Sequence, residues 1–219
     1  VFAKTVRIGA AYGVDLILIE TMNDSLETKA AVLAAKENCD LPVFVSNVYG
    51  ADGKLMTGAS PAAMVAMLEG LGVDALGCNC SLGPRQLTGV VEELLENASI
   101  PVLVQPNAGL PRVENGQTVF DVTMEEFARD VRLLTEKGVG IVGGCCGTTP
   151  DYIRLLKKET KDVPFLSPVK KNKTVISSYS HAVEFGREPV LIGERINPTG
   201  KKRFQQALRE KDIAYVLNE

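Results

Sequence analysis

The segment IVGGCCGTTP, residues 141–150, places two cysteines side by side between glycines at the end of an apolar run. Adjacent cysteines can bond to each other only with strain. The pair therefore indicates a metal site, a reactive thiol or core packing, with a strained disulfide as a further alternative. Because Cys80 ends another apolar run, DALGCNC, three thiols are candidate ligands of one site: Cys80, Cys145 and Cys146.

Three thiolates with an open fourth position are a ligand set that suits a catalytic zinc site, whereas a closed structural site takes four protein ligands. The remaining candidates are poorly placed to be a fourth ligand. Cys78 lies one layer deeper on the same strand, Cys39 lies late in a helix, and His181 lies in an irregular segment. We interpret Cys78 and Cys39 as packing residues. Zinc with an open position would deprotonate a substrate thiol, so we expect a thiol substrate.

Composition narrows the class of protein. The chain has 219 residues, a net charge of -3, 45% hydrophobic residues and 23% charged residues, and this balance predicts a globular protein without a nucleic-acid partner. No apolar run approaches the roughly 20 residues that span a membrane. Five cysteines, an odd number without a secretory signal, favour a reducing compartment, and we expect the cytoplasm.

One pattern recurs along the chain: a short apolar run, a polar or glycine-rich turn, and an amphipathic helix. Most of the runs are apolar on both faces, as is typical of parallel strands covered by helices. Ser60 with Pro61, and Thr123 with Glu126, carry helix-start signals. The predicted strands are 15–21, 42–48, 74–80, 101–107 and 138–145.

Consecutive βα units indicate either a doubly wound sheet or a (β/α)8 TIM barrel. Polar or thiol groups stand at the carboxyl ends of all five predicted strands: Glu20, Asn47, Cys80, Asn107 and the pair Cys145–Cys146. Ligands gather at these ends in both folds, but polar groups on so many strands favour the mouth of a barrel. We interpret Glu20, which ends an apolar strand, as a site residue. Asn107 could also be a turn former.

The character of the sequence changes near residue 163. We expect a partial barrel over 1–165, a linker over 166–188, rich in proline, serine and lysine, and the start of a second domain over 189–219. A predicted strand over 190–197 and a following helix are too little to bury a core. We therefore expect the chain to be a piece of a longer protein.

Three segments resemble the homocysteine S-methyltransferase family: GCNCSLGP (77–84), QPNAGLP (105–111) and GGCCGTTPDYI (143–153). The resemblance covers about 1–165. It implies a barrel in which Cys80, Cys145 and Cys146 hold zinc. It also implies that Glu20, in ETMNDSLETKAA, recognises the amino group of homocysteine and that Asn107 contacts the substrate. The five βα units would be the fourth to the eighth of the barrel.

The tail, IGERINPTGKKRFQQAL (192–208), resembles the start of the pterin-binding barrel of cobalamin-dependent methionine synthases. This implies methyl transfer from methylcobalamin, recharged by 5-methyltetrahydrofolate, and places Asn197 at the folate-binding mouth. The cobalamin domain itself would be a partner region outside this chain. The alternatives are a methyltransferase that uses betaine or S-methylmethionine, a non-enzymatic thiol protein that stores metal or acts in redox chemistry, and an inactive piece.

Overall fold

Five parallel strands form the central sheet, in the order β1-β2-β3-β4-β7. They are β1 (Ile17–Met22), β2 (Val43–Asn47), β3 (Ala75–Asn79), β4 (Val102–Gln105) and β7 (Ile141–Val142). Each overlaps one of the predicted runs. The computed structural model describes residues 1–186, 188–193 and 196–218, and it divides into two units, Val1–Glu184 and Phe185–Glu219.

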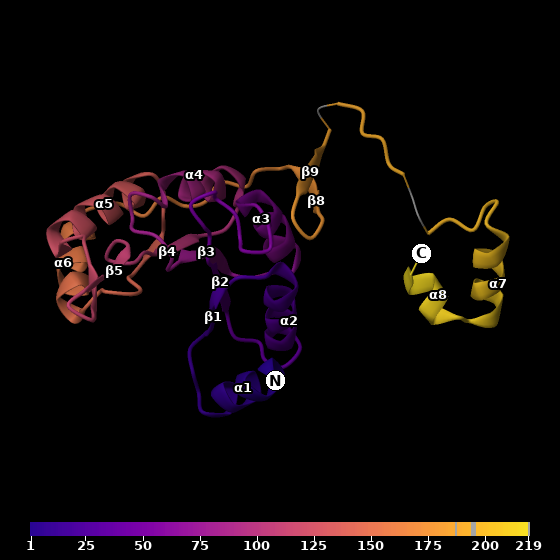
Figure 1. Cartoon of the computed structure of the whole chain (residues 1–219), viewed down its shortest axis with the longest axis horizontal. Coiled ribbons are helices and arrows are strands. Elements are labelled where there is room, and N and C mark those ends of the chain that lie inside the picture. The colour runs from indigo at the N-terminus through magenta and orange to yellow at the C-terminus, as the bar shows by residue number, and fades with distance from the viewer. Residues whose placement is uncertain (187, 194–195, 219) are drawn as a thin grey trace. The chain divides into compact units, whose positions relative to one another are not determined.

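Helices alternate with these strands, which confirms the predicted α/β fold made of consecutive βα units. Figure 1 shows α2 to α6 following the outer side of the curved sheet. Among the described residues, no helix is both long enough and apolar enough to cross a membrane. The helices of the first unit are α1 (Phe2–Ala11), α2 (Ser25–Lys36), α3 (Pro61–Gly70), α4 (Thr88–Asn97), α5 (Met124–Glu136) and α6 (Pro150–Thr160).

Side-chain caps begin α2, α3 and α5, and the last two are the helices whose start signals were noted in the sequence. Asp24 accepts a hydrogen bond from the Glu27 amide at 2.7 Å, and Ser60 caps α3 in the same way. Thr123 and Glu126 form a reciprocal capping box on α5. These caps satisfy amides that the first helical turn leaves without partners. Each helix therefore begins at a defined distance from the strand before it.

The two faces of the sheet are covered differently. One face is buried against the helices in the main hydrophobic core, to which it contributes Val43, Val45, Leu76, Cys78, Val102 and Val104. On the opposite face at β1, Leu16 is 37% exposed and Leu18 is 43% exposed. The edge strand β1 is thus only half buried, although its sequence is apolar on both faces.

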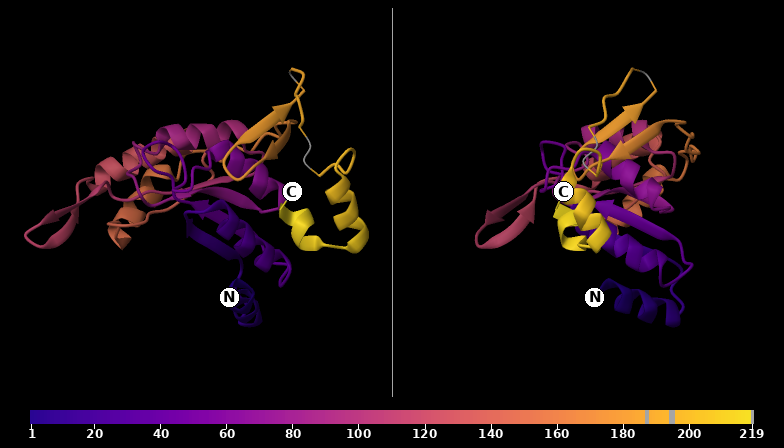
Figure 2. Two further views of the ribbon diagram at one scale, coloured as in Figure 1. Left: turned by 45° about the vertical axis from the view of Figure 1, so that its right-hand side comes forward. Right: turned by 90° about the vertical axis from the view of Figure 1, so that its right-hand side faces the viewer.

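A hairpin that the sequence analysis did not predict follows β4. It consists of β5 (Pro111–Glu114) and β6 (Gln117–Phe120), which pair antiparallel. Asn115 and Gly116 connect them with φ of 49° and 77°, as a two-residue type I′ turn requires. The Asn-Gly pair between strand-forming residues was the available signal. In both views of Figure 2 the hairpin extends away from the sheet.

The range predicted as a linker contains a second two-stranded sheet, made of β8 (Thr174–Ser177) and β9 (Ala182–Phe185). Its turn is held against the starts of α2 and α3. The carbonyl of Ser180 accepts from the Ser60 amide at 3.1 Å, and the carbonyl of Tyr179 accepts from the Ser25 hydroxyl at 3.0 Å. Part of this range is therefore fixed to the first unit, which ends at Glu184.

The second unit contains α7 (Lys202–Glu210) and α8 (Ile213–Asn218). Phe204 is buried, and the Arg203 guanidinium lies 4.9 Å from the centroid of the Tyr215 ring. A strand was predicted over 190–197. Residues 190–193 and 196–197 do not form a strand, and positions 194 and 195 lie outside the described residues. Asn197 accepts a hydrogen bond from the Thr199 amide at 2.9 Å. Its expected folate contact stays a prediction.

The capping box on α5 gives a test of the fold. Thr123→Ala removes the side chain that caps this helix, and we expect a loss of about 1 kcal/mol in the free energy of unfolding. Urea denaturation followed by circular dichroism measures it. Thr118→Ala, at an exposed hairpin position, is the matched control and should change stability by less than about 0.5 kcal/mol. Equal effects of the two changes would contradict the role of the cap.

Candidate metal centre

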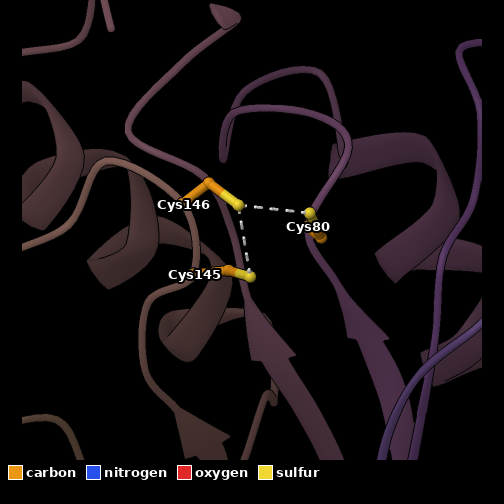
Figure 3. Close-up of side chains that lie close together, drawn as sticks. All are labelled: Cys80, Cys145 and Cys146. Carbon is orange, nitrogen blue, oxygen red and sulfur yellow. Dashed lines mark hydrogen bonds between the residues drawn. The ribbon is translucent and has the colours of Figure 1, made fainter. Parts of the chain in front are cut away.

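Three cysteines that are far apart in sequence come together at the carboxyl ends of the strands. Cys80 directly follows β3, and Cys145 and Cys146 lie in the loop after β7. The Sγ atoms of Cys80 and Cys146 are 3.6 Å apart, and those of Cys145 and Cys146 are 4.0 Å apart (Figure 3). All three sulfurs lie within 4.8 Å of one another. The structure thus assembles the candidate ligands that the sequence singled out.

Backbone hydrogen bonds shape the loop that carries Cys145 and Cys146. The Cys145 amide donates to the Pro106 carbonyl at 2.8 Å, and the Cys146 carbonyl accepts from the Ala108 amide at 2.9 Å. Gly147 follows with a φ of 80°, and a Cβ there would come within 2.4 Å of the Phe120 ring. Only glycine meets both conditions. The loop therefore presents two consecutive sulfurs from a fixed backbone.

Cys80 lies in a tight left-handed turn. Its φ is 60° and that of Ser81 is 63°, a conformation that residues other than glycine adopt at some energetic expense. The Cys80 amide donates to the Gln105 carbonyl at 3.0 Å, and the Cys80 carbonyl accepts from the Leu82 amide at 2.7 Å. These contacts hold the turn, so that the Cys80 side chain faces the loop after β7.

The arrangement fits a zinc ion. With Zn–S bonds near 2.3 Å and tetrahedral angles, ligand sulfurs are roughly 3.8 Å apart. The distances from the Cys146 sulfur to those of Cys80 and Cys145, 3.6 and 4.0 Å, lie on either side of that value. They are far longer than the roughly 2.05 Å of a disulfide. All three sulfurs are free thiols, and a set of soft thiolates selects zinc or copper(I) over magnesium or calcium.

The electrostatics of the cluster differ from those of the buried Cys78. Burial alone raises the pKa of the Cys78 thiol to about 12, which keeps it protonated and agrees with a packing role. Burial also acts to raise the pKa of Cys80, but hydrogen bonds from the Ser81 amide and from the neighbouring thiols bring it below its ordinary value. Of the three clustered thiols, Cys80, Cys145 and Cys146, Cys80 therefore loses its proton first.

The other two thiols hold their protons more tightly. The hydrogen bond to Cys80 is the main reason that the pKa of Cys146 rises to about 11. Burial is the main reason that the pKa of Cys145 is raised. Removing all three protons places three negative charges within a few ångströms, which only a bound cation offsets well.

The two residues expected to contact substrate lie in different settings. Glu20, near the end of β1, is exposed. Asn107 is only 3% exposed, and its Oδ1 accepts a hydrogen bond from the Cys146 amide at 3.0 Å. Its side chain therefore takes part in positioning the cysteine loop, which is more than a turn former does. Asn47 is buried, and its amide nitrogen donates to the Thr28 hydroxyl at 3.1 Å.

Two further polar side chains at strand ends were missed by the sequence analysis. Asn79, between Cys78 and Cys80, is fully buried, and its Nδ2 lies 3.7 Å from the Cys145 sulfur. The Oε1 of Gln105, at the end of β4, is buried and has no hydrogen-bond partner among the described residues. A polar residue that ends an apolar strand was the available signal in both cases.

Comparison with known proteins identifies relatives of this chain. The sequence model of the family described as "Homocysteine S-methyltransferase" matches residues 1–160. The chain is 35% identical over 219 residues to the methionine synthase of Mycobacterium leprae (strain TN). It is 34% identical over 214 residues to that of Mycobacterium tuberculosis (strain ATCC 25618 / H37Rv). Each match covers 94% of this chain but 18% of the relative, so the chain spans less than a fifth of the length of these relatives.

Solved structures agree on the fold. The metallated form of the homocysteine methyltransferase MmuM from Escherichia coli superposes with a TM-score of 0.57 at 23% identity, over 71% of this chain and 51% of that one. Its apo form gives 0.56 at 24% identity, over 72% and 57%. The sheet described above therefore corresponds to part of a TIM barrel. With the match over residues 1–160 and these relatives, the chain belongs to the homocysteine S-methyltransferase family.

Proposed function

We propose that this chain forms the homocysteine-binding part of a cytoplasmic methionine synthase, in which Cys80, Cys145 and Cys146 hold a zinc ion. The observation that carries the proposal is the cluster of three thiols, whose sulfurs lie within 4.8 Å of one another in a chain of this family. Bound zinc would lower the pKa of the homocysteine thiol, so that the substrate enters the reaction as a thiolate.

Glu20 is the proposed contact for the substrate's ammonium group. It is exposed near the end of β1, on the side of the sheet away from the helical core, where a ligand can reach it. A carboxylate that accepts a hydrogen bond from an ammonium makes a charge-assisted bond. Glu20 therefore binds one end of the amino acid while the three sulfurs define the position of the other.

Asn107 is the second proposed substrate contact. The Cys146 amide occupies its Oδ1, while its side chain also acts on Cys80, whose pKa it helps to lower. A side chain that touches both sulfur-bearing segments lies at the position where a substrate sulfur must arrive. We propose that Asn107 positions these segments and contacts the incoming thiol.

The methyl donor is proposed to be methylcobalamin, recharged by 5-methyltetrahydrofolate, with the cobalamin domain supplied by another part of the protein. The support is the tail over 192–208 and the two relatives described as methionine synthases. Asn197 is the proposed folate contact in that tail. Betaine and S-methylmethionine are the alternative donors, and the tail argues against them because it resembles the start of a pterin-binding barrel.

Removal of one sulfur tests the metal site. We expect the intact protein to hold one zinc per chain, and Cys145→Ala to lose it, together with more than about 100-fold of methyl transfer, because changes outside the ligand shell already cost 10–100-fold. Elemental analysis and a methyl-transfer assay measure the two effects. Cys39→Ala, outside the cluster, is the control and should retain both. Full activity of Cys145→Ala would refute the site.

X-ray absorption separates an enzyme from a metal-storage or thiol redox protein. We expect the zinc spectrum of the intact protein to show three sulfur ligands, and a fourth sulfur when homocysteine is added, because the cluster supplies three thiols within 4.8 Å of one another. A storage protein gives the same spectrum with and without homocysteine. An unchanged spectrum would therefore exclude direct activation of the substrate thiol.

Loss of charge at Glu20 tests substrate recognition. Glu20→Gln keeps the shape but removes the negative charge, and hydrogen bonds to charged groups contribute about 1.5–3 kcal/mol. We expect the KM for homocysteine to rise about 10- to 100-fold with a smaller change in kcat. Glu37→Gln, an exposed position after α2, is the control. Unchanged KM values in both variants would remove Glu20 from the site.

A further inference from the structure

Asn79 uses its whole hydrogen-bonding capacity inside the protein. Its Oδ1 accepts from the Thr21 amide at 3.1 Å and from the Ser46 hydroxyl. Its Nδ2 donates to the Thr21 hydroxyl at 2.8 Å and to the Cys145 sulfur at 3.7 Å. An asparagine amide offers two acceptor and two donor positions, and all four are filled. Such a side chain has a single favourable orientation.

That orientation defines the contact with the sulfur. The Thr21 amide can only donate, so the atom facing it must be the carbonyl oxygen of Asn79. The NH2 group then faces Cys145, where the sulfur acts as the acceptor. This N–H···S hydrogen bond joins the Cys145 side chain to the end of β3 and restricts where its sulfur can lie.

The other end of the network holds a strained backbone. Thr21 has a φ of 64°, a conformation in which a β-branched residue is an outlier. Both of its hydrogen bonds to Asn79, one through the backbone and one through the hydroxyl, act on this residue. Outliers of this kind persist only where surrounding contacts enforce them. Because Thr21 directly follows Glu20, the same contacts hold the backbone from which the Glu20 side chain extends.

We propose that Asn79 is a positioning residue that links the two halves of the site, holding Glu20 through Thr21 and Cys145 through an N–H···S hydrogen bond. It thereby sets the separation between the carboxylate and the metal-binding sulfurs, and with it the length of amino thiol that the site accepts. This inference rests on the proposed function. It adds a selectivity role for a residue that touches neither the metal nor the substrate.

Asn79→Asp in the intact protein separates the two ends of the network. The aspartate keeps an oxygen for the Thr21 amide and for Ser46, but it turns a second oxygen toward Cys145. We expect zinc affinity, measured by competition with a chelating dye, to fall about 10- to 100-fold. In the cobalt-substituted protein, the sulfur-to-cobalt charge-transfer band should shift, because the thiolate loses its hydrogen bond.

Asn79→Ala removes both ends, including the support of Thr21. We expect homocysteine binding to the zinc-loaded protein to weaken about 10-fold beyond the effect of Asn79→Asp. Selectivity for homocysteine over cysteine, which is one methylene shorter, should fall as well, because a defined site discriminates one methylene by about 10- to 200-fold. Titration calorimetry with each amino acid measures both. If this variant does not fold, the zinc affinity and the cobalt band of Asn79→Asp test the positioning role of Asn79.

Ser46→Ala is the matched control. It removes one bond to the same Oδ1 and leaves the contacts with Thr21 and Cys145 in place. We expect zinc affinity within about 3-fold of the wild type. If Asn79→Asp is equally close to the wild type and shows no shift of the cobalt band, the inference is wrong while the proposed function stands. A wild-type protein that binds no zinc overturns both.

Discussion

The site depends on the curvature of the sheet. Neighbouring strands lie about 4.8 Å apart, so strands two positions apart are separated by roughly 9–10 Å in a flat sheet. Asn79 on β3 nevertheless contacts Thr21 on β1 and Cys145 after β7, each two strands away. One short side chain can do so only if the sheet curls toward it from both sides. The polar network is therefore a direct consequence of barrel curvature.

Within that curve, the end of β4 acts as the common scaffold for the sulfurs. The Gln105 carbonyl accepts from the Cys80 amide, and the Pro106 carbonyl accepts from the Cys145 amide. Two consecutive carbonyls thus hold sulfur-bearing segments on opposite sides of one strand. The separation of the sulfurs follows from backbone geometry. Nearby N–H groups then act against the effect of burial: with the Ser81 amide among its donors, the pKa of Cys80 falls below its ordinary value, whereas the Asn79 NH2 group only partly offsets the burial that raises the pKa of Cys145.

The strands and helices could be predicted from short stretches of sequence, whereas contacts between residues far apart in the sequence were harder to predict. Strands and capped helices depend on neighbours in sequence, which is why the runs before Asn47 and Cys80 and the cap at Thr123 were found. Grouping polar residues at strand ends also predicted which cysteines meet. The hairpin at Asn115 was predictable from its Asn-Gly pair. The contacts of Asn79 were not, because they join residues 58 and 66 positions away whose approach depends on curvature.

In the proposed site, the two ends of the substrate would be recognised from the two edges of the described sheet. Glu20 lies on β1, and Cys145 and Cys146 follow β7, so the whole width of five strands lies between them. Any change in twist or curl alters the distance between these two edges, and a connection at the middle of the sheet restricts such changes. β3 is the middle strand, and Asn79 is its last residue. A buried amide there reaches both edges at once, which a residue on β2 or β4 is less well placed to do.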